Sequence, residues 1–157
     1  MNSPKPNLFF LLWLMLVLAI SVPGYAVSEE RRFSITENRV ITDQGGRRIR
    51  VSRPFCRIIS LYGAHTENLF YLGADEQIIG VSINDTYPSN VSEKQRFSYH
   101  DDPEKFLSVR PDLVLIRPMI ENGYPQFVKQ LRAYGITVIS FQPSTIEEVY
   151  QYWEALG

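Results

Sequence analysis

A polar segment of this chain holds the residue types best suited to metal or acid–base chemistry. Its residues are Ser98, Tyr99, His100, Asp101 and Asp102, and imidazole and carboxylate groups are common ligands of transition metals. Consecutive loop residues rarely point at one ion, and the chain has only two histidines. A bare metal site is therefore the weaker interpretation of this segment.

Sequence motifs of common enzyme classes are missing. The chain has no G-x-S-x-G nucleophile elbow, no G-x-x-x-x-G-K-S/T phosphate loop, no G-x-G-x-x-G turn and no H-E-x-x-H helix. His100 beside Asp101 does not make a catalytic triad, because nothing identifies a nucleophile. We expect binding without chemistry and no cofactor of the protein's own, and part of an α/β enzyme stays as an alternative.

Four short apolar runs alternate with helical stretches and must position these residues. The runs are β-branched or aliphatic and short, as expected of strands covered on both faces; they span residues 57–61, 78–81, 111–116 and 137–141. Parallel strands joined by helices need cover on both faces of the sheet. The sequence therefore predicts an α/β fold with a Rossmann-like parallel sheet and flanking helices.

Helices are expected between and after these strands. Apolar residues recur at helical spacing over residues 65–72 and 124–134, and Gly73 and Gly135 stand where a helix C-terminus favours positive φ. Residues 84–102 lose this periodicity and form a long polar loop after a parallel strand, where open α/β sheets bind ligands. Short helices are expected over 103–109, with Asp102 as N-cap, and from residue 144 onward.

The N-terminal residues 1–26 have the composition of a secretory signal peptide. Lys5 precedes an apolar run over residues 8–22, and Gly24-Tyr25-Ala26 is a small-x-small cleavage site. The alternative is a membrane anchor, but the run is shorter than the ~20 residues that span a bilayer. We expect cleavage, which makes the mature chain soluble and exported.

The mature chain divides into two parts. Residues 27–52 are expected to contain a β-hairpin with strands at 39–42 and 47–51 around the turn Asp43-Gln44-Gly45-Gly46. Residues 53–157 are expected to form the α/β domain.

Charge and cysteine content exclude two further classes. The formal net charge of −1 leaves no basic excess to neutralise phosphates, so no nucleic acid is expected as partner. The single Cys56 cannot form an internal disulfide, and beside the first strand it is expected to be a buried apolar thiol.

The ordered set of segments resembles the N-terminal lobe of periplasmic substrate-binding proteins of ABC importers for vitamin B12, ferric siderophores and haem. The segments include DQGGRRIRV, RIISLYGAHTENLFYLGA, IIGVS, PEKFLSVRPDLVLI and LRAYGITVISF, and the resemblance covers about residues 41–157. It implies a two-lobed protein with a bridging helix. We therefore expect that the C-terminal lobe is absent and that the chain is a fragment or a truncated product.

The resemblance also implies site residues, partners and location. Ligand residues would come from loops at the lobe rim, and our candidates are Tyr62, Tyr87, Tyr99, His100 and Arg117, with Gly63, His65 and Met119 nearby. The ligand would be a metal chelate or a corrinoid, passed to an ABC permease in the inner membrane by a monomeric periplasmic protein. The tyrosines could instead only pack against the lobe, and Arg117 could be a solvated charge.

A docking residue follows from the same resemblance. In that family a Glu in an A-x-T-E setting at the start of the first lobe helix pairs with arginines of the permease, and Ala64 to Glu67 (AHTE) matches this setting. A carboxylate in the first turn of a helix is favoured by the helix dipole. Glu67 is therefore our docking candidate, and support of its own helix terminus is the alternative.

The members of that family differ in their ligands, and the residues around Tyr99 bear on the choice. Haem-binding members place a Tyr near this position with an Arg close behind, but here His100, Asp101 and Asp102 follow. Cobalamin binders tend to place Trp where this chain has Tyr99 and Arg117. Arg and aromatic side chains suit ferric siderophores, so an iron chelate is slightly favoured over cobalamin. An exported interaction protein that uses this lobe alone is a further alternative.

Overall fold

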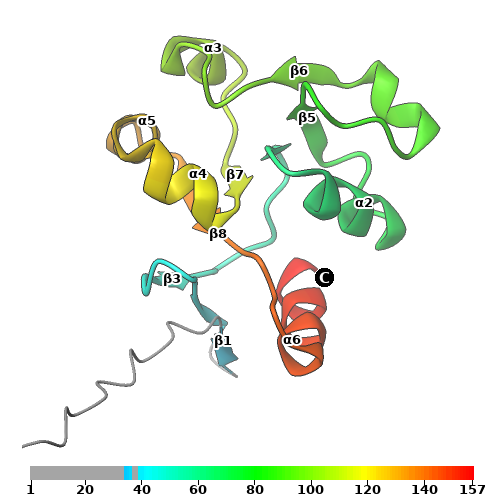
Figure 1. Cartoon of the computed structure of the whole chain (residues 1–157), viewed down its shortest axis with the longest axis vertical. Coiled ribbons are helices and arrows are strands. Elements are labelled where there is room, and N and C mark those ends of the chain that lie inside the picture. Colours follow the sequence, from blue (N-terminus) through cyan, green and yellow to red (C-terminus); the bar gives the residue numbers. More distant parts are fainter. Residues whose placement is uncertain (1–33, 37–38) are drawn as a thin grey trace, which may run out of the picture. The chain divides into compact units, whose positions relative to one another are not determined.

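The structure is a computed structural model that describes residues 34–36 and 39–157 (Figure 1). The predicted signal peptide and residues 27–33 lie outside the described residues. Within the described ranges, no helix combines the length and apolar character needed to cross a membrane.

Five parallel strands form the main sheet, in the order β6-β5-β4-β7-β8. They are β4 (Ile58–Ser60), β5 (Ile78–Ser82), β6 (Gln95–Phe97), β7 (Leu113–Ile116) and β8 (Thr137–Ser140). Four of them confirm the predicted strands. The fifth, β6, was not predicted, because it is a three-residue edge strand in which only Phe97 is buried. The predicted loop over residues 84–102 was therefore wrong in part, since it contains β6 and the 3-10 helix η1 (Ser89–Glu93).

Alternation along the central strands divides the core into two layers. In β7, Leu113 and Leu115 join one buried cluster, whereas Val114 and Ile116 join the other. The first cluster also contains Leu69 of helix α2 (Gly63–Tyr71), and Tyr152 of helix α6 (Ile146–Leu156). Figure 1 shows α2 and α6 on one side of the sheet and α3, α4 and α5 on the other.

The opposite face is covered by three short helices. They are α3 (Pro103–Ser108), α4 (Pro118–Gly123) and α5 (Pro125–Ala133). Asp102 accepts a hydrogen bond from the Glu104 backbone N–H at 2.9 Å, which confirms the predicted N-cap of α3. Helix α4 was not predicted, and α2 begins two residues earlier than expected.

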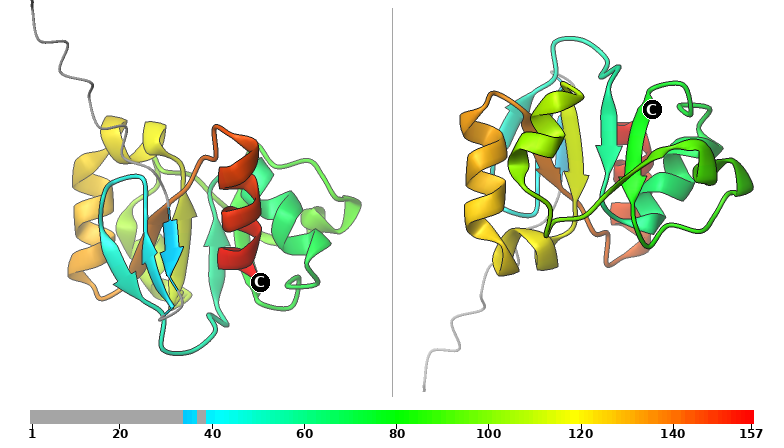
Figure 2. Two further views of the ribbon diagram at one scale, coloured as in Figure 1. Left: turned by 90° about the horizontal axis from the view of Figure 1, so that it is seen from below. Right: turned by 90° about the horizontal axis from the view of Figure 1, so that it is seen from above.

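The predicted hairpin is confirmed and belongs to a separate three-stranded antiparallel sheet (Figure 2). Its strands are β1 (Ser34–Thr36), β2 (Val40–Thr42) and β3 (Arg48–Arg50). Ile41 is buried in the same cluster as α2 and α6, so this small sheet packs on the α/β core rather than standing apart from it.

One glycine of β5 is required by a close contact with the edge strand. A Cβ at Gly80 would lie 2.4 Å from the Phe97 ring, a separation that real Cβ atoms do not show. Phe97 is fully buried, so its ring occupies the space beside the Gly80 backbone.

The expectation of a buried Cys56 thiol was wrong, because Cys56 is exposed. It lies in the loop before β4, where its backbone N–H donates to Asp112 Oδ2 at 2.9 Å. The bond fixes the backbone of this loop and leaves the side chain outside the core.

Candidate functional site

The predicted ligand residues all follow the carboxyl ends of parallel strands. Tyr62 comes after β4, Tyr87 after β5, Tyr99 and His100 after β6, and Arg117 directly after β7. Because parallel strands end at the same edge of a sheet, the topology places these residues at one edge. We call it the carboxyl edge.

The strand order places Tyr62 and Arg117 at the point of this edge where ligand binding is most common in open α/β sheets. From β4 the chain extends to β5 and β6 on one side, then returns to β7 and β8 on the other side of β4. Open α/β sheets bind ligands in the crevice where the strand order reverses in this way. Here that point lies between the ends of β4 and β7.

Arg117 stacks on Tyr62 at this point. The guanidinium carbon lies 4.9 Å from the centroid of the Tyr62 ring, and both side chains are half-buried. No ion pair of the described residues includes Arg117. The guanidinium therefore keeps hydrogen-bond donors available at the edge, and it is not simply a solvated charge.

A second group joins Tyr99 and His100 with a residue that the sequence interpretation missed. The ring centroids of Tyr99 lie 4.4 Å from those of His100 and 4.6 Å from those of Tyr124, and Tyr124 Oη lies 3.5 Å from His100 Nε2. Tyr124 had been assigned to a helix. It instead lies between α4 and α5, and its position between Gly123 and Pro125 was the signal for a break.

Tyr87 stands apart from both groups. It is 65 % exposed and precedes Pro88 through a cis peptide bond. Among the described residues, no ring contact connects it to Tyr62, Tyr99 or Arg117.

The acidic residues beside His100 have structural partners. Asp101 forms an ion pair with Lys105 at 2.7 Å and accepts a hydrogen bond from the Ser98 backbone N–H at 2.8 Å. Burial raises the pKa of Asp101, but these two bonds lower it by more, so it lies below its usual value. Over the described residues, no group of three His, Cys, Asp or Glu side chains is arranged to hold a metal ion.

His65, which we had placed among the rim residues, faces the core instead. It is 1 % exposed, its Nε2 lies 3.1 Å from the Ile116 carbonyl oxygen, and its Nδ1 lies 2.7 Å from Tyr152 Oη. Burial lowers the pKa of His65 to about 4. A neutral ring satisfies both contacts when Nε2–H donates to Ile116 and Nδ1 accepts from Tyr152. His65 therefore joins α2, β7 and α6 as a structural residue.

Glu67 is exposed as predicted, but its place in the helix differs. Helix α2 begins at Gly63 and has no acidic residue in its first turn, so Glu67 lies in the second turn. The dipole argument for Glu67 was therefore wrong, because that effect fades beyond the first turn. Glu104 does lie in a first turn, that of α3, and is exposed just after the Tyr99 segment. The sequence interpretation missed Glu104, although the Asp102 cap had indicated where α3 begins.

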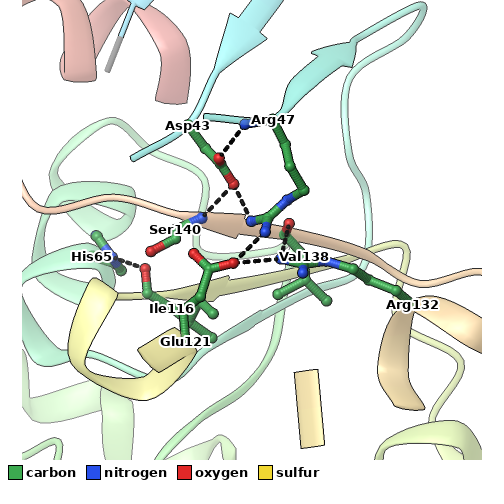
Figure 3. A network of polar contacts seen from close by, with 8 residues as sticks. All are labelled: Asp43, Arg47, His65, Ile116, Glu121, Arg132, Val138 and Ser140. Carbon is green, nitrogen blue, oxygen red and sulfur yellow. Dashed lines mark hydrogen bonds and ion pairs between the residues drawn. The ribbon is translucent and has the colours of Figure 1, made fainter. Parts of the chain in front are cut away.

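A network of paired charges fixes the hairpin turn to the α/β core (Figure 3). Arg47 forms ion pairs with Asp43 and with Glu121 of α4, and Glu121 also binds Arg132 of α5 at 3.2 Å. Burial raises the pKa of Glu121, but the bonds and charges of Arg47 and Arg132 lower it by more, so the net shift is downward. Asp43 is fully buried and accepts from the Ser140 backbone N–H at 3.4 Å.

Fold and site together define one α/β lobe, whose carboxyl edge carries aromatic rings and the Arg117 guanidinium, which has no ion pair among the described residues. No known family profile matches the chain. Its sequence does match curated proteins. An uncharacterized ABC transporter substrate-binding lipoprotein of Bacillus subtilis, YvrC, is 31% identical over 119 residues, which cover 74% of this chain and 38% of that protein. The vitamin B12-binding protein of Vibrio cholerae is 32% identical over 111 residues, covering 68% and 40%.

Solved structures give the same relationship. A possible iron-binding, periplasmic solute-binding protein of Staphylococcus epidermidis is 34% identical with a TM-score of 0.57, covering 62% of this chain and 39% of that chain. The vitamin B12-binding protein of V. cholerae is 32% identical with a TM-score of 0.57, covering 66% and 40%. The haem-binding protein HmuT, at 22% identity and a TM-score of 0.63, shares the fold.

The predicted resemblance is therefore confirmed: the chain is a relative of ABC-transporter substrate-binding proteins of the vitamin B12, haem and siderophore class, and it matches part of one lobe. These relatives are solute-binding transport proteins and not enzymes. The chain spans about two fifths of the length of the curated relatives it matches, 38% and 40% for the two named above.

Proposed function

We propose that this chain is one lobe of an exported, periplasmic substrate-binding protein that delivers an iron chelate or cobalamin to an ABC permease. The observation that carries the proposal is the Arg117 guanidinium, stacked on Tyr62 at the switch point of the sheet and free of any ion pair among the described residues. A cation with free donors, next to aromatic rings, suits a ligand that is both flat or bulky and anionic.

The ligand class is tested by direct titration. The protein expressed from its complete reading frame is titrated with haem, cyanocobalamin and the anionic chelate ferric enterobactin, while absorbance and intrinsic fluorescence are followed. We expect saturable binding of one of the iron compounds, because Arg117 favours an anionic or strongly polar chelate. Absence of binding by all three would reject the proposal for these classes. The 157-residue chain alone should bind weakly, since a second lobe supplies half of the contacts in this mode of binding.

Two exposed carboxylates are candidates for permease docking. Glu67 matches the family setting, and Glu104 meets the physical criterion of an exposed carboxylate in a first helix turn. A carboxylate at such a surface can form charge-assisted hydrogen bonds with an arginine of a partner.

The two candidates are separated by single variants in a transport assay with membranes that contain the permease. Glu67→Ala or Glu104→Ala should abolish stimulated transport while ligand affinity is unchanged, and Glu76→Ala, an exposed carboxylate beyond the end of α2, serves as the matched control. Equal loss of affinity and transport would reject docking for that residue. Export itself is tested by fractionation, with the protein expected outside the cytoplasm.

A further inference from the structure

A buried carboxylate ties the loop that carries Tyr87 to helix α2. Asp85 is 5% exposed, and its Oδ2 accepts a hydrogen bond from Thr66 Oγ1 at 2.5 Å. Thr66 is itself fully buried, and its Oγ1 lies 2.8 Å from Ser60 Oγ at the end of β4. A carboxylate that leaves water for such a position needs hydrogen bonds to offset the cost. Thr66 supplies one of these bonds from the helix.

The backbone around Asp85 is held from other sides as well. Arg96 of β6 donates through Nη1 to the carbonyl oxygens of Asp85 at 2.6 Å and Ser82 at 3.0 Å. A Cβ at Gly63 would lie 3.4 Å from Asp85 Oδ1, so the carboxylate sits against the first residue of α2. The loop after β5 is thereby fixed to β4, β6 and α2 at one point.

The Asp85–Thr66 bond lies close in sequence to one candidate ligand residue and one candidate docking residue. Tyr87, two residues after Asp85, is a candidate ligand residue, and Glu67, directly after Thr66, is a candidate docking residue. Burial raises the pKa of Asp85, and the nearby charge of Glu67 adds to this increase, although the Thr66 bond opposes it. A cation that pairs with Glu67 would therefore also reduce the repulsion at Asp85.

We propose that Asp85 is a positioning residue, whose bond to Thr66 holds the Tyr87 loop on helix α2 so that the loop and the helix respond to ligand and partner as one unit. The positioning follows from the contacts alone, whereas the coupling to ligand and permease rests on the proposed function. If the coupling exists it is reciprocal: ligand contact at Tyr87 strengthens partner contact at Glu67, and the reverse.

The positioning is tested by amide hydrogen exchange of the full chain without ligand or partner. Thr66→Val and Asp85→Asn should accelerate exchange over residues 83–88 by about ten- to a hundredfold, the range expected for losing a hydrogen bond to a charged group. The double variant should add little to Thr66→Val, because Thr66→Val already removes the donor of the bond that Asp85→Asn weakens by replacing the charged acceptor with a neutral amide. Thr86→Val, which removes an exposed hydroxyl from the same loop, is the matched control and should leave exchange unchanged.

Two further measurements keep the test decisive. Exchange in β7 and β8 should not change, and Thr66→Ser, which keeps the hydroxyl, should restore slow exchange over residues 83–88. Unchanged exchange over 83–88 in both Thr66→Val and Asp85→Asn would overturn the positioning role. So would acceleration that is equal in β7 and in the loop and is not rescued by Ser, because that pattern reports global destabilisation only.

The coupling is tested with haem, cyanocobalamin and ferric enterobactin as probes on the protein from the complete reading frame. Thr66→Val should lower the affinity for the probe that binds the wild type about tenfold, whereas Thr86→Val should leave that affinity unchanged. Equal affinity of wild type and Thr66→Val, together with accelerated loop exchange, would overturn the coupling and leave the proposed function standing. Failure of the wild-type protein to bind any probe would reject the proposed function, and the exchange result would still decide the role of Asp85.

Discussion

Helix α4 has a paired charge cluster within it and an unpaired charge at its start. Glu121 binds Arg47 and Arg132, and Arg47 also binds the buried Asp43, so that each charge has a partner of opposite sign. Arg117, which precedes the helix, stacks on the ring of Tyr62 and has no ion pair among the described residues. The two arginines Arg47 and Arg117 are similarly half-buried, yet their surroundings differ completely.

The difference separates the structural role of Arg47 from the proposed binding role of Arg117. Paired charges in a half-buried position fix the hairpin turn to α4 and α5, segments that lie far apart in the sequence. Arg117 is half-buried without an ion pair among the described residues, and under the proposed function a ligand anion supplies that interaction.

The largest effect is expected for Asp43→Ala. The substitution leaves the backbone N–H groups of Arg47 and Ser140 without their carboxylate acceptor and breaks a buried ion pair. Unfolding free energy from urea titration should fall by about 4 kcal/mol. Lys105→Ala, which breaks the more exposed pair with Asp101, is the control and should cost less than about 1 kcal/mol. A loss below that level for Asp43→Ala would contradict the structural role of the cluster.

The next effect concerns pH and the core beneath Arg117. Burial lowers the pKa of His65 from 6.5 to about 4, so between these values the unfolded chain binds a proton that the folded chain does not. The contribution of His65 to the free energy of unfolding is complete above pH 6.5. About 3 kcal/mol of this free energy is lost as the pH falls to 4. Urea titrations across this range should show the decline, and His65→Phe should flatten it. An equally steep decline in His65→Phe would assign the effect to other groups.

Arg117→Met tests the unpaired charge directly. Ligand affinity should fall by about ten- to a hundredfold through lost charged hydrogen bonds, while the free energy of unfolding changes by less than about 1 kcal/mol. Arg132→Met should show the reverse pattern, with lower stability and unchanged affinity, because the Arg132 guanidinium is already paired with Glu121. Titration of both variants with the bound probe, beside urea midpoints, decides the matter. A lower free energy of unfolding in Arg117→Met would indicate that Arg117 has a structural role, like Arg47 and Arg132.

The smallest effects are expected among the edge tyrosines. Tyr99→Ala should weaken ligand binding up to about tenfold, as expected for one lost aromatic contact, and Tyr87→Ala by less, because Tyr87 lies outside the Tyr99, His100 and Tyr124 group. Fluorescence titration is sensitive enough for both. A larger effect at Tyr87 than at Tyr99 would move the centre of the site toward the loop after β5.

Much of the sheet could be predicted from sequence because buried parallel strands are continuous apolar runs. Residues 113–116 are buried throughout, and their neighbours β4 and β8 have the same character. The edge strand β6 has water on one side and contains the polar residues Gln95 and Arg96. It therefore lacks the continuous apolar run that predicts a buried strand. Helix α4 was missed for a related reason, since Pro118 was taken as part of a turn although Pro also begins helices.

The candidate site was predictable only as a set of strand ends. Residues that follow predicted strands must meet at one edge, which placed Tyr62 and Arg117 there from sequence, whereas Tyr99 was expected only within the long loop because β6 was not predicted. Whether a side chain turns toward the edge or the core depends on tertiary contacts, and His65 turned inward because Tyr152, from a helix far along the chain, supplies its partner. Tyr124 and the Asp85–Thr66 bond depend on such long-range contacts as well.

The absence of a side chain at Gly80 has a consequence for the proposed ligand site. The Phe97 ring fills that gap, and the chain turns immediately afterward into the residues that would meet a guest molecule. Adding a single methyl group at position 80 would push the outermost strand sideways and carry Tyr99 with it. The position of Tyr99 therefore depends on the missing side chain at Gly80, because Phe97, which occupies that space, precedes Tyr99 by two residues.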